Sequence, residues 1–248
     1  AWIKDSSDPS VPLSKRLTIP ADVNHARNGV IKENVVHNAI SPIIGSVGIY
    51  LDGARNITVK GNTCYNNTVG FAIDSQQPGD ATGNTLRRNI AYGNTDAGLV
   101  VGTSHDDSAV NNTTVIHNEF RNNQSQGGRG GEITIQSVNG LDIDNNLFAS
   151  RSDVIAVVSK PATNLKLNNN LYYGASKHPD TAIFDWGGIN GLTYVGLSKF
   201  QAATCNDLSS VYQDASSIKY FEQIKHRSGR NKQLSKIRRA CYRGNKIW

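Results

Sequence analysis

The sequence predicts an all-β solenoid, a right-handed parallel β-helix built as a single-stranded solenoid with three short strands per coil. Two observations favour this fold. Six segments of the 248-residue chain share one pattern, in which an aliphatic residue is followed by an asparagine three positions later and an apolar residue two positions after that. Between these segments, short runs alternate apolar and polar residues, and no helical period is seen. A repeat of about this length indicates a stacked architecture.

The asparagine of each repeat is expected at the bend between two strands. Successive asparagines are 28, 27, 29, 28 and 24 residues apart, at Asn34, Asn62, Asn89, Asn118, Asn146 and Asn170. Asparagine tolerates turn geometry and hydrogen-bonds nearby backbone groups. Equivalent asparagines on coils that stack at the usual interstrand distance of about 4.8 Å can also bond one another, which predicts an asparagine ladder.

A third strand in each coil completes the repeat. Its copies cover residues 48–52, 70–74, 98–102 and 132–136, and apolar residues such as Ile49, Leu51, Phe71 and Ile73 recur at every second position. This alternation predicts that one set of side chains fills the core and the other faces outward. Asp52 and Asp74, which end the first two copies, belong to the outward set.

The charge distribution divides the chain. Residues Lys219–Trp248 contain ten Lys and Arg and one acid, a net charge of +9, so the +6 of the whole chain leaves residues 1–218 with −3. We predict an irregular segment or cap at 1–23, the β-helix at 24–196, a C-terminal cap with a short helix at Leu197–Thr204 within 197–218, and a solvated basic tail at 219–248. A nucleic-acid-binding tail is the weaker interpretation, because it has no recognisable motif.

These coils resemble the right-handed parallel β-helix proteins of the pectate-lyase-like group. The resemblance covers roughly residues 25–214, and it is carried by the ladder together with the segments Gly48–Gly53, Gly131–Gln136 and Leu197–Asp214. It implies the fold, whereas the fold itself hosts lyases, hydrolases, epimerases and binding proteins. The segment 197–214 departs from the family pattern at Cys205, where relatives have glycine. The basic tail replaces further coils, which we interpret as truncation or a shifted reading frame near Asp214.

In the pectate-lyase-like group the substrate lies along the sheet that here ends in Asp52 and Asp74. One coil separates these residues, so their α-carbons are expected about 5 Å apart. Such a carboxylate pair suits a retaining glycosidase, with one nucleophile and one acid. It also suits a Ca²⁺ site. In a third interpretation, each aspartate only caps its own turn through backbone hydrogen bonds.

Further polar residues are expected along the same face as substrate-binding residues, namely Tyr50, His105, Asp106, Asp107, Glu132, Gln136 and Lys160. A histidine beside two acids suits general acid–base chemistry, and a solvated loop is its alternative. Lys160 suits the base of a lyase, or is simply a surface lysine. Glu132 is expected to point outward and contact sugar hydroxyls. Arg87 and Arg88 precede a ladder asparagine, and no role is assigned to them.

The sequence therefore favours a carbohydrate-active protein, a glycoside hydrolase or a polysaccharide lyase that acts on an extracellular glycan. The alternative is a non-catalytic structural or carbohydrate-binding solenoid, or an inactive fragment of such an enzyme. We expect an extracellular or periplasmic monomer that binds a polysaccharide or oligosaccharide and no membrane, although no signal peptide is visible. No cofactor is required by the pattern, and Ca²⁺ is the one candidate.

Overall fold

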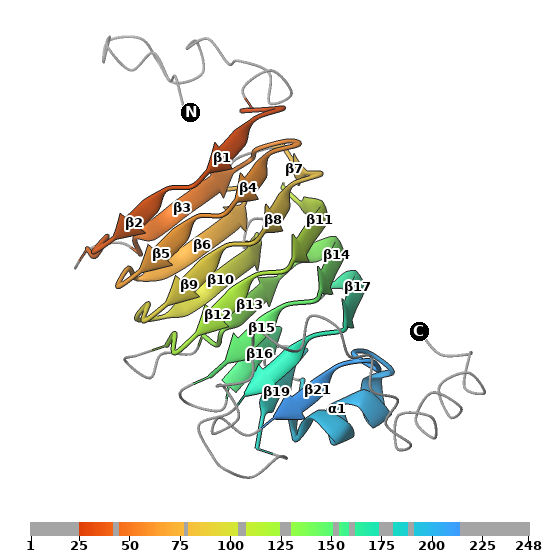
Figure 1. Cartoon of the computed structure of the whole chain (residues 1–248). Helices are drawn as coiled ribbons and strands as arrows, with labels where there is room; N and C mark the ends of the chain where they lie inside the picture. Colours follow the sequence, from red (N-terminus) through yellow and green to blue (C-terminus); the bar gives the residue numbers. More distant parts are fainter. Residues whose placement is uncertain are drawn as a thin grey trace, which may run out of the picture.

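The molecule winds into a right-handed parallel β-helix with three sheets along its length (Figure 1). The computed structural model describes residues 25–41, 45–76, 79–103, 108–124, 130–150, 154–158, 162–173, 181–187 and 191–213. The predicted fold class, with three strands per coil, is confirmed.

The strands of successive coils line up into three sheets. Sheet A contains β1 (Val30–Lys32), β4 (Thr58–Lys60), β7 (Ala81–Thr82), β8 (Thr85–Arg87), β11 (Val110–Ile116), β14 (Val138–Asp144) and β17 (Thr163–Asn168). Sheet B contains β2 (Val35–His37), β5 (Thr63–Tyr65), β9 (Ile90–Tyr92), β12 (Glu119–Arg121), β15 (Leu147–Ala149), β18 (Leu171–Tyr173) and β21 (Val211–Gln213). Sheet C contains β3 (Val47–Asp52), β6 (Val69–Asp74), β10 (Ala97–Gly102), β13 (Ile133–Gln136), β16 (Val154–Val158), β19 (Ile183–Trp186) and β20 (Leu192–Val195).

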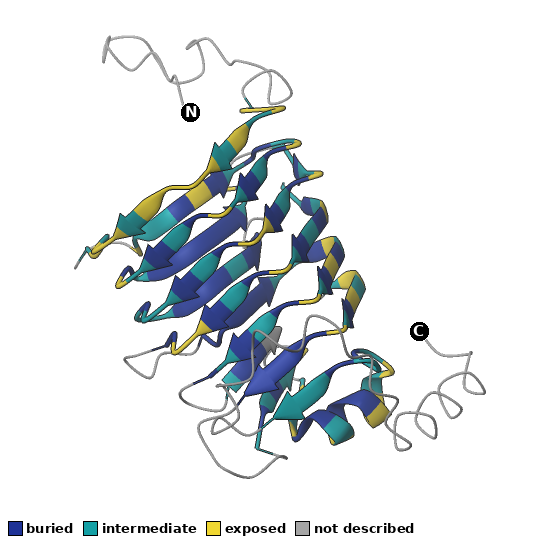
Figure 2. Ribbon diagram, viewed as in Figure 1, coloured by how far each residue is buried: buried dark blue, intermediate teal, exposed yellow. Residues whose placement is uncertain are grey.

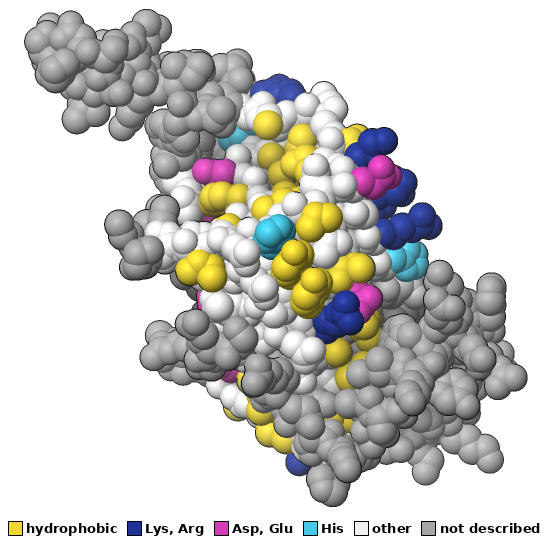
Figure 3. Space-filling view, turned by 60° about the vertical axis from the view of Figure 1, so that its left-hand side comes forward, with side chains coloured by type: hydrophobic (Ala, Val, Ile, Leu, Met, Phe, Trp, Pro, Cys, Tyr) yellow, Lys and Arg dark blue, Asp and Glu magenta, His cyan; other side chains and the backbone are white. Residues whose placement is uncertain are grey.

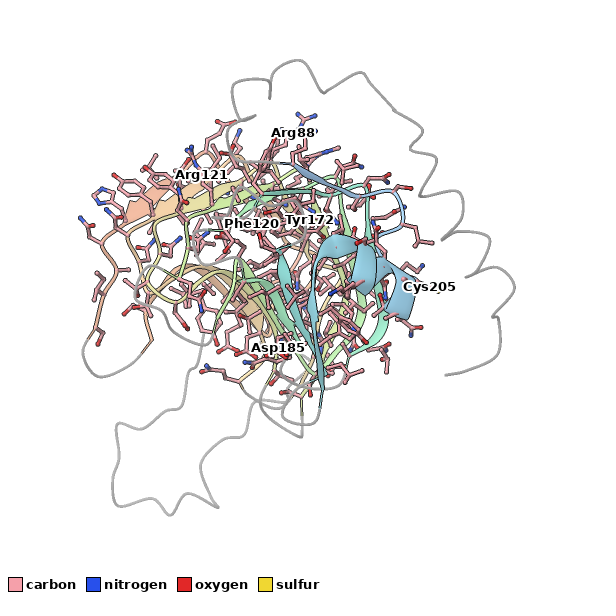
Figure 4. The ribbon with its side chains drawn as sticks, turned by 90° about the horizontal axis from the view of Figure 1, so that it is seen from below. Arg88, Phe120, Arg121, Tyr172, Asp185 and Cys205 are labelled. Carbon is pink, nitrogen blue, oxygen red and sulfur yellow. The ribbon has the colours of Figure 1, made fainter. Side chains whose placement is uncertain are left out.

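The core consists of columns of equivalent side chains. Neighbouring strands are parallel, apart from the antiparallel pair of β19 and β20, and Ile49, Phe71 and Leu99 lie opposite one another in register. These positions are buried along the whole stack (Figure 2). Seen end-on, Phe120 and Tyr172 lie inside the coil (Figure 4), and each stacks on Phe148 with ring centroids 5.3 and 5.4 Å apart. Because every inward position repeats in register, apolar burial is continuous between coils.

The first asparagine ladder, defined by Asn34, Asn62, Asn89, Asn118, Asn146 and Asn170, forms as predicted. In a representative step, the backbone N–H and the side-chain Nδ2 of Asn62 both donate to Oδ1 of Asn89, at 2.9 and 3.0 Å. The same pair of bonds joins each member to the next. Each of these asparagine–asparagine bonds runs toward the C-terminal coil, whereas Nδ2 also donates to a carbonyl of the preceding coil, as from Asn62 to Ile31 at 3.0 Å. At the C-terminal end, Nδ2 of Asn170 donates to the buried carboxylate of Asp207 at 3.2 Å.

A second asparagine ladder, defined by Asn67, Asn94 and Asn123, was not predicted. The backbone N–H of Asn67 donates to Oδ1 of Asn94 at 3.0 Å, and Nδ2 of Asn94 donates to Oδ1 of Asn123 at 2.7 Å. This ladder ends at Glu132, whose two carboxylate oxygens accept the backbone N–H and Nδ2 of Asn123 at 3.1 and 2.5 Å. Each ladder therefore ends on a buried carboxylate.

The C-terminal part of the described chain carries the helix that the sequence predicts, α1 (Leu197–Thr204). The ring of Phe200 stacks on Phe184 with centroids 4.3 Å apart, so the helix packs against the last core positions. The predicted segments 1–23 and 219–248 lie outside the described residues. No helix in the described part of the chain has the length and apolar character needed to cross a membrane.

Candidate functional site

The two aspartates predicted as a pair lie side by side at the ends of β3 and β6. Asp52 and Asp74 are register partners in sheet C, which places their α-carbons about 4.8 Å apart. Ile49 and Leu51 on β3 are buried and point inward. Because side chains alternate along a strand, both carboxylates lie on the outer face, where both residues are half-exposed.

Asp74 is held by three neighbours. Its Oδ1 accepts the backbone N–H of Ser75 at 2.6 Å, its Oδ2 accepts the hydroxyl of Tyr50 at 3.4 Å, and the hydroxyl of Thr103 also donates to it. Burial raises the pKa of Asp74 above its ordinary value, and the charge of Asp52 raises it further, although the three hydrogen bonds act in the opposite direction. The raised pKa makes Asp74 a candidate proton donor.

Asp52 has a different environment. Its Oδ1 accepts the backbone N–H of Gln76, one coil away, at 2.8 Å. Within the described residues, Oδ2 of Asp52 accepts no hydrogen bond, so one carboxylate oxygen is open to a ligand on the outer face. The bond from Ser75 to Asp74 is a capping contact within its own turn, as the third interpretation requires, whereas the bond from Gln76 to Asp52 joins two coils.

Tyr50 bridges the first two coils. Its side chain is 39% exposed, and its hydroxyl donates to Asp74. Burial, followed by the charges of Asp74 and Asp52, raises the pKa of the Tyr50 phenol, which remains a hydrogen-bond donor at neutral pH. Tyr50 thus joins the aspartate pair on the outer face, and its role toward a substrate stays a prediction.

The positions of sheet C that are equivalent to Asp52 and Asp74 continue for two more coils. Gly102, which follows Asp74 in the row, has a φ of +119° and lies opposite Gln136 at the end of β13. A β-carbon on Gly102 would come within 1.5 Å of the carbonyl oxygen of Gln136, so this position excludes a side chain. Gln136 is half-exposed on the predicted face, but two coils separate it from Asp74.

Glu132 is a correction to the predicted site. It was expected on the outer face, but its side chain is 1% exposed and accepts both bonds from Asn123. The residue precedes β13 rather than lying within it, so strand alternation does not apply to it. Burial raises the pKa of Glu132 to about 8. Glu132 therefore terminates the second ladder and contacts no substrate.

Four predicted residues, His105, Asp106, Asp107 and Lys160, lie outside the described residues. The sequence reasoning missed Thr103, whose position directly after Gly102, at the end of the same strand, was the available signal. Two further aromatic residues of sheet C, Trp186 and Tyr194, pack against Phe200, with ring centroids 4.8 and 5.8 Å away.

A metal at this site would depend on few protein ligands. In the described part of the chain, no group of three or more His, Cys, Asp or Glu side chains is arranged to hold an ion. Asp52 and Asp74 together could offer carboxylate oxygens to Ca²⁺, which takes six to eight oxygen ligands. Most of its ligands would then come from water or from a substrate.

Comparison with known families matches residues 19–148, just over half of the chain, to the family described as the right handed beta helix region. Among curated proteins, the chain is similar to the uncharacterized protein YwoF of Bacillus subtilis (strain 168), with 26% identity over 173 residues. That match covers 67% of this chain and 36% of YwoF, so the chain spans about a third of that relative. No solved structure gives a significant match.

Proposed function

This chain belongs to the right-handed β-helix family, and on that premise we propose that it is a glycoside hydrolase that cleaves an extracellular polysaccharide with Asp52 and Asp74. The observation that carries the proposal is the register pairing of these carboxylates on the outer face of sheet C. Retaining glycosidases place two carboxyl groups about 5–5.5 Å apart, a separation that neighbouring coils supply.

The unequal environments of the two aspartates assign their roles. Asp74, whose pKa is raised by burial and by Asp52, is the general acid that protonates the leaving oxygen. Asp52, with one free carboxylate oxygen, is the nucleophile that attacks the anomeric carbon. Tyr50 orients Asp74 through its hydroxyl and offers an exposed ring to the sugar. This division of roles favours hydrolysis over lyase chemistry, which needs a base rather than an acid at this position.

A panel of neutral and acidic polysaccharides tests the proposal. We expect Asp52→Asn and Asp74→Asn each to lower kcat/KM by about 100-fold or more, because each removes a group that acts in the transition state. Asp142→Asn, an exposed carboxylate on sheet A, is the matched control and should leave activity unchanged. Unaltered activity in both site variants would contradict the proposal, and unsaturated sugar ends in the product would indicate a lyase.

Tyr50→Phe gives an independent readout of the assignment of Asp74 as the acid. The Tyr50 hydroxyl lowers the pKa of Asp74, so its removal should raise that pKa further. Activity requires protonated Asp74 and falls as pH rises through its pKa. The descending limb of the pH–rate profile should therefore move to higher pH. A limb that does not move would remove Asp74 from the acid role.

The alternative is a non-catalytic carbohydrate-binding solenoid. It is favoured by one observation, that the backbone amides of Ser75 and Gln76 already donate to the carboxylates of Asp74 and Asp52. Wild-type protein that binds a polysaccharide without cleaving any member of the panel would support this alternative.

A further inference from the structure

The N-terminal edge of sheet C is buried although no described strand covers it. Strand β3 is the last member of this sheet, and among the described residues it pairs with β6 alone (Figure 1). Its inward residues Ile49 and Leu51 are nonetheless buried. In the same coil, the inward residues of β1 and β2, Ile31 and Val36, are only half-buried, and Figure 3 shows hydrophobic side chains exposed at this end of the stack. Burial at this edge therefore requires a neighbour for β3 that β1 and β2 do not have.

The described chain enters the stack in a fixed register with the next coil. Arg27 forms a parallel bridge with Arg55, 28 positions later. A β-carbon on Gly53 would come within 2.7 Å of Nδ1 of His25, so His25 lies against the residue that follows it by the same interval. Strands β1 and β2 keep this offset from β4 and β5. The register of the coil is therefore set from its first described residue, one position after Asn24.

The sequence before His25 has the alternation of a sheet C strand at this register. Counted back 28 positions from β3, the inward set is apolar and the outward set is polar. The inward residues are Ile19, Ala21 and Val23, and the outward residues are Asp22 and Asn24. Such alternation is typical of a half-buried strand. Pro20 lies near the start of the run, where a strand tolerates proline, and the family match begins at residue 19.

From this register we propose that residues 19–24 add a strand to the edge of β3 and place Asn24 beside Asp52, next in line after Asp74 and Asp52. Neighbouring strands lie about 4.8 Å apart, so the Asn24 amide reaches the Asp52 carboxylate. A carboxylate has about four acceptor positions, and among the described residues Asp52 uses one, for the backbone N–H of Gln76. Asn24 can therefore hold Asp52 in place and leave an oxygen free to react, which makes Asn24 a positioning residue.

Cysteine cross-linking in the full chain tests the register without reference to activity. An Asn24→Cys/Asp52→Cys variant, treated with oxidised glutathione, should form a disulfide in most molecules, because opposed residues have α-carbons within the roughly 4.4–6.8 Å that a disulfide spans. The matched control is Asn24→Cys/Tyr50→Cys, in which the second position lies diagonally opposite, roughly 7–8 Å away, and should stay reduced. Mass spectrometry of unreduced peptides measures both. Equal cross-linking in the two variants, or none in the first, would overturn the proposal.

Amide hydrogen exchange tests the proposed alternation. Val23→Asn puts an amide at an inward position without a hydrogen-bond partner, so the amides of β3 should exchange about tenfold faster than in the wild type. Asp22→Asn introduces the same residue at an outward position and should leave the exchange of β3 unchanged. If β3 exchanges at the same rate in both variants, residues 19–24 do not form the strand that covers it.

The positioning role of Asn24 rests on the proposed function, whereas its register does not. Asn24→Ala should lower kcat about tenfold and leave KM unchanged, because a group that acts through Asp52 contributes in the transition state rather than in substrate binding. Asn24→Ser keeps a donor and should recover part of the loss. An active wild type with an unaltered Asn24→Ala variant would overturn the positioning role. Cross-linking at Asn24 in a protein that cleaves no polysaccharide would support the register and contradict the proposed function alone.

Discussion

Glu132 is a buried acidic residue at a position that is glycine in the three preceding coils. In the preceding coils this register position belongs to Gly48, Gly70 and Gly98, each the second residue of its sheet C strand, whereas β13 begins one residue after Glu132. In those coils a β-carbon on the glycine would come within 2.9 Å of the Nδ2 of a second-ladder asparagine. In the coil of Glu132 the corresponding ladder position is Arg151 in the sequence, not asparagine. The glutamate therefore supplies the two acceptors that the last ladder member, Asn123, requires.

The raised pKa of Glu132 predicts a pH-dependent stability. The native protein holds a proton on Glu132 up to about pH 8, whereas the unfolded chain releases it near 4.5. The folded state thus binds more protons between these values, and the free energy of unfolding should fall as pH rises through this window, by up to about 5 kcal/mol. Urea denaturation at a series of pH values measures the slope.

Glu132→Gln isolates this contribution. The variant does not titrate, so the part of the slope due to Glu132 should vanish, although the variant is less stable because its amide NH₂ meets the donors of Asn123. Asp207, whose pKa burial raises to about 6, adds a slope of the same sign at lower pH. The comparison is therefore most specific between pH 6 and 8, where identical slopes in the two proteins would refute the assignment.

At the scale of the element, the ladder turns determine which polar groups can be buried. Asn118 is 2% exposed, and its Oδ1 accepts both the backbone N–H and Nδ2 of Asn89 at 2.9 and 3.0 Å. Its own Nδ2 donates to the carbonyl oxygen of Leu86 and to Asn146. Each interior asparagine thus satisfies groups on the coils before and after it, which a purely apolar turn could not do.

Asn118→Ala should consequently destabilise the protein by about 2–4 kcal/mol, because two buried donors of Asn89 lose their acceptor. The end of the ladder provides the matched control. Asn34 is exposed, and its backbone N–H still reaches Asn62 after truncation of the side chain, so Asn34→Ala should cost about 1 kcal/mol or less. Chemical denaturation compares the two, and equal losses would mean that the ladder acts through local turn preference alone.

Whether the sequence could predict the direction of a side chain depends on whether the residue lies inside a strand or in a turn. Asp52 and Asp74 were placed correctly because both lie inside strands, where alternation fixes the side-chain direction. Glu132 was misplaced because it lies one residue outside its strand, where direction depends on the turn. The second ladder went unnoticed although its members follow the first by five residues, since only Asn67, Asn94 and Asn123 repeat. Contacts such as that of Thr103 with Asp74 depend on loop geometry that no repeat encodes.

On the scale of the whole molecule, the solenoid separates its surfaces by sheet. The aspartate pair lies on sheet C, the basic side chains of Lys60 and Arg87 lie on sheet A, and the rings of Tyr65 and Tyr92 lie on sheet B, each set on neighbouring coils in register. Because each coil contacts only its neighbours, a change on one face is transmitted mainly along its own column. Variants of these basic residues and of the aspartate pair should therefore act independently of each other, as additivity between distant sites requires.

The same nearest-neighbour architecture predicts graded local stability. Strands β1 and β2 carry exposed apolar residues, Val30 at 64% and Val35 at 65%, and their inward residues are only half-buried. In the middle of the stack, Leu86, Val115 and Phe120 are 0–1% exposed. Local opening is easiest where little apolar surface is buried, so amide hydrogen exchange should be fastest in β1 and β2 and slowest in β8, β11 and β12. Uniform protection along the stack would instead indicate that the whole solenoid opens as one cooperative unit.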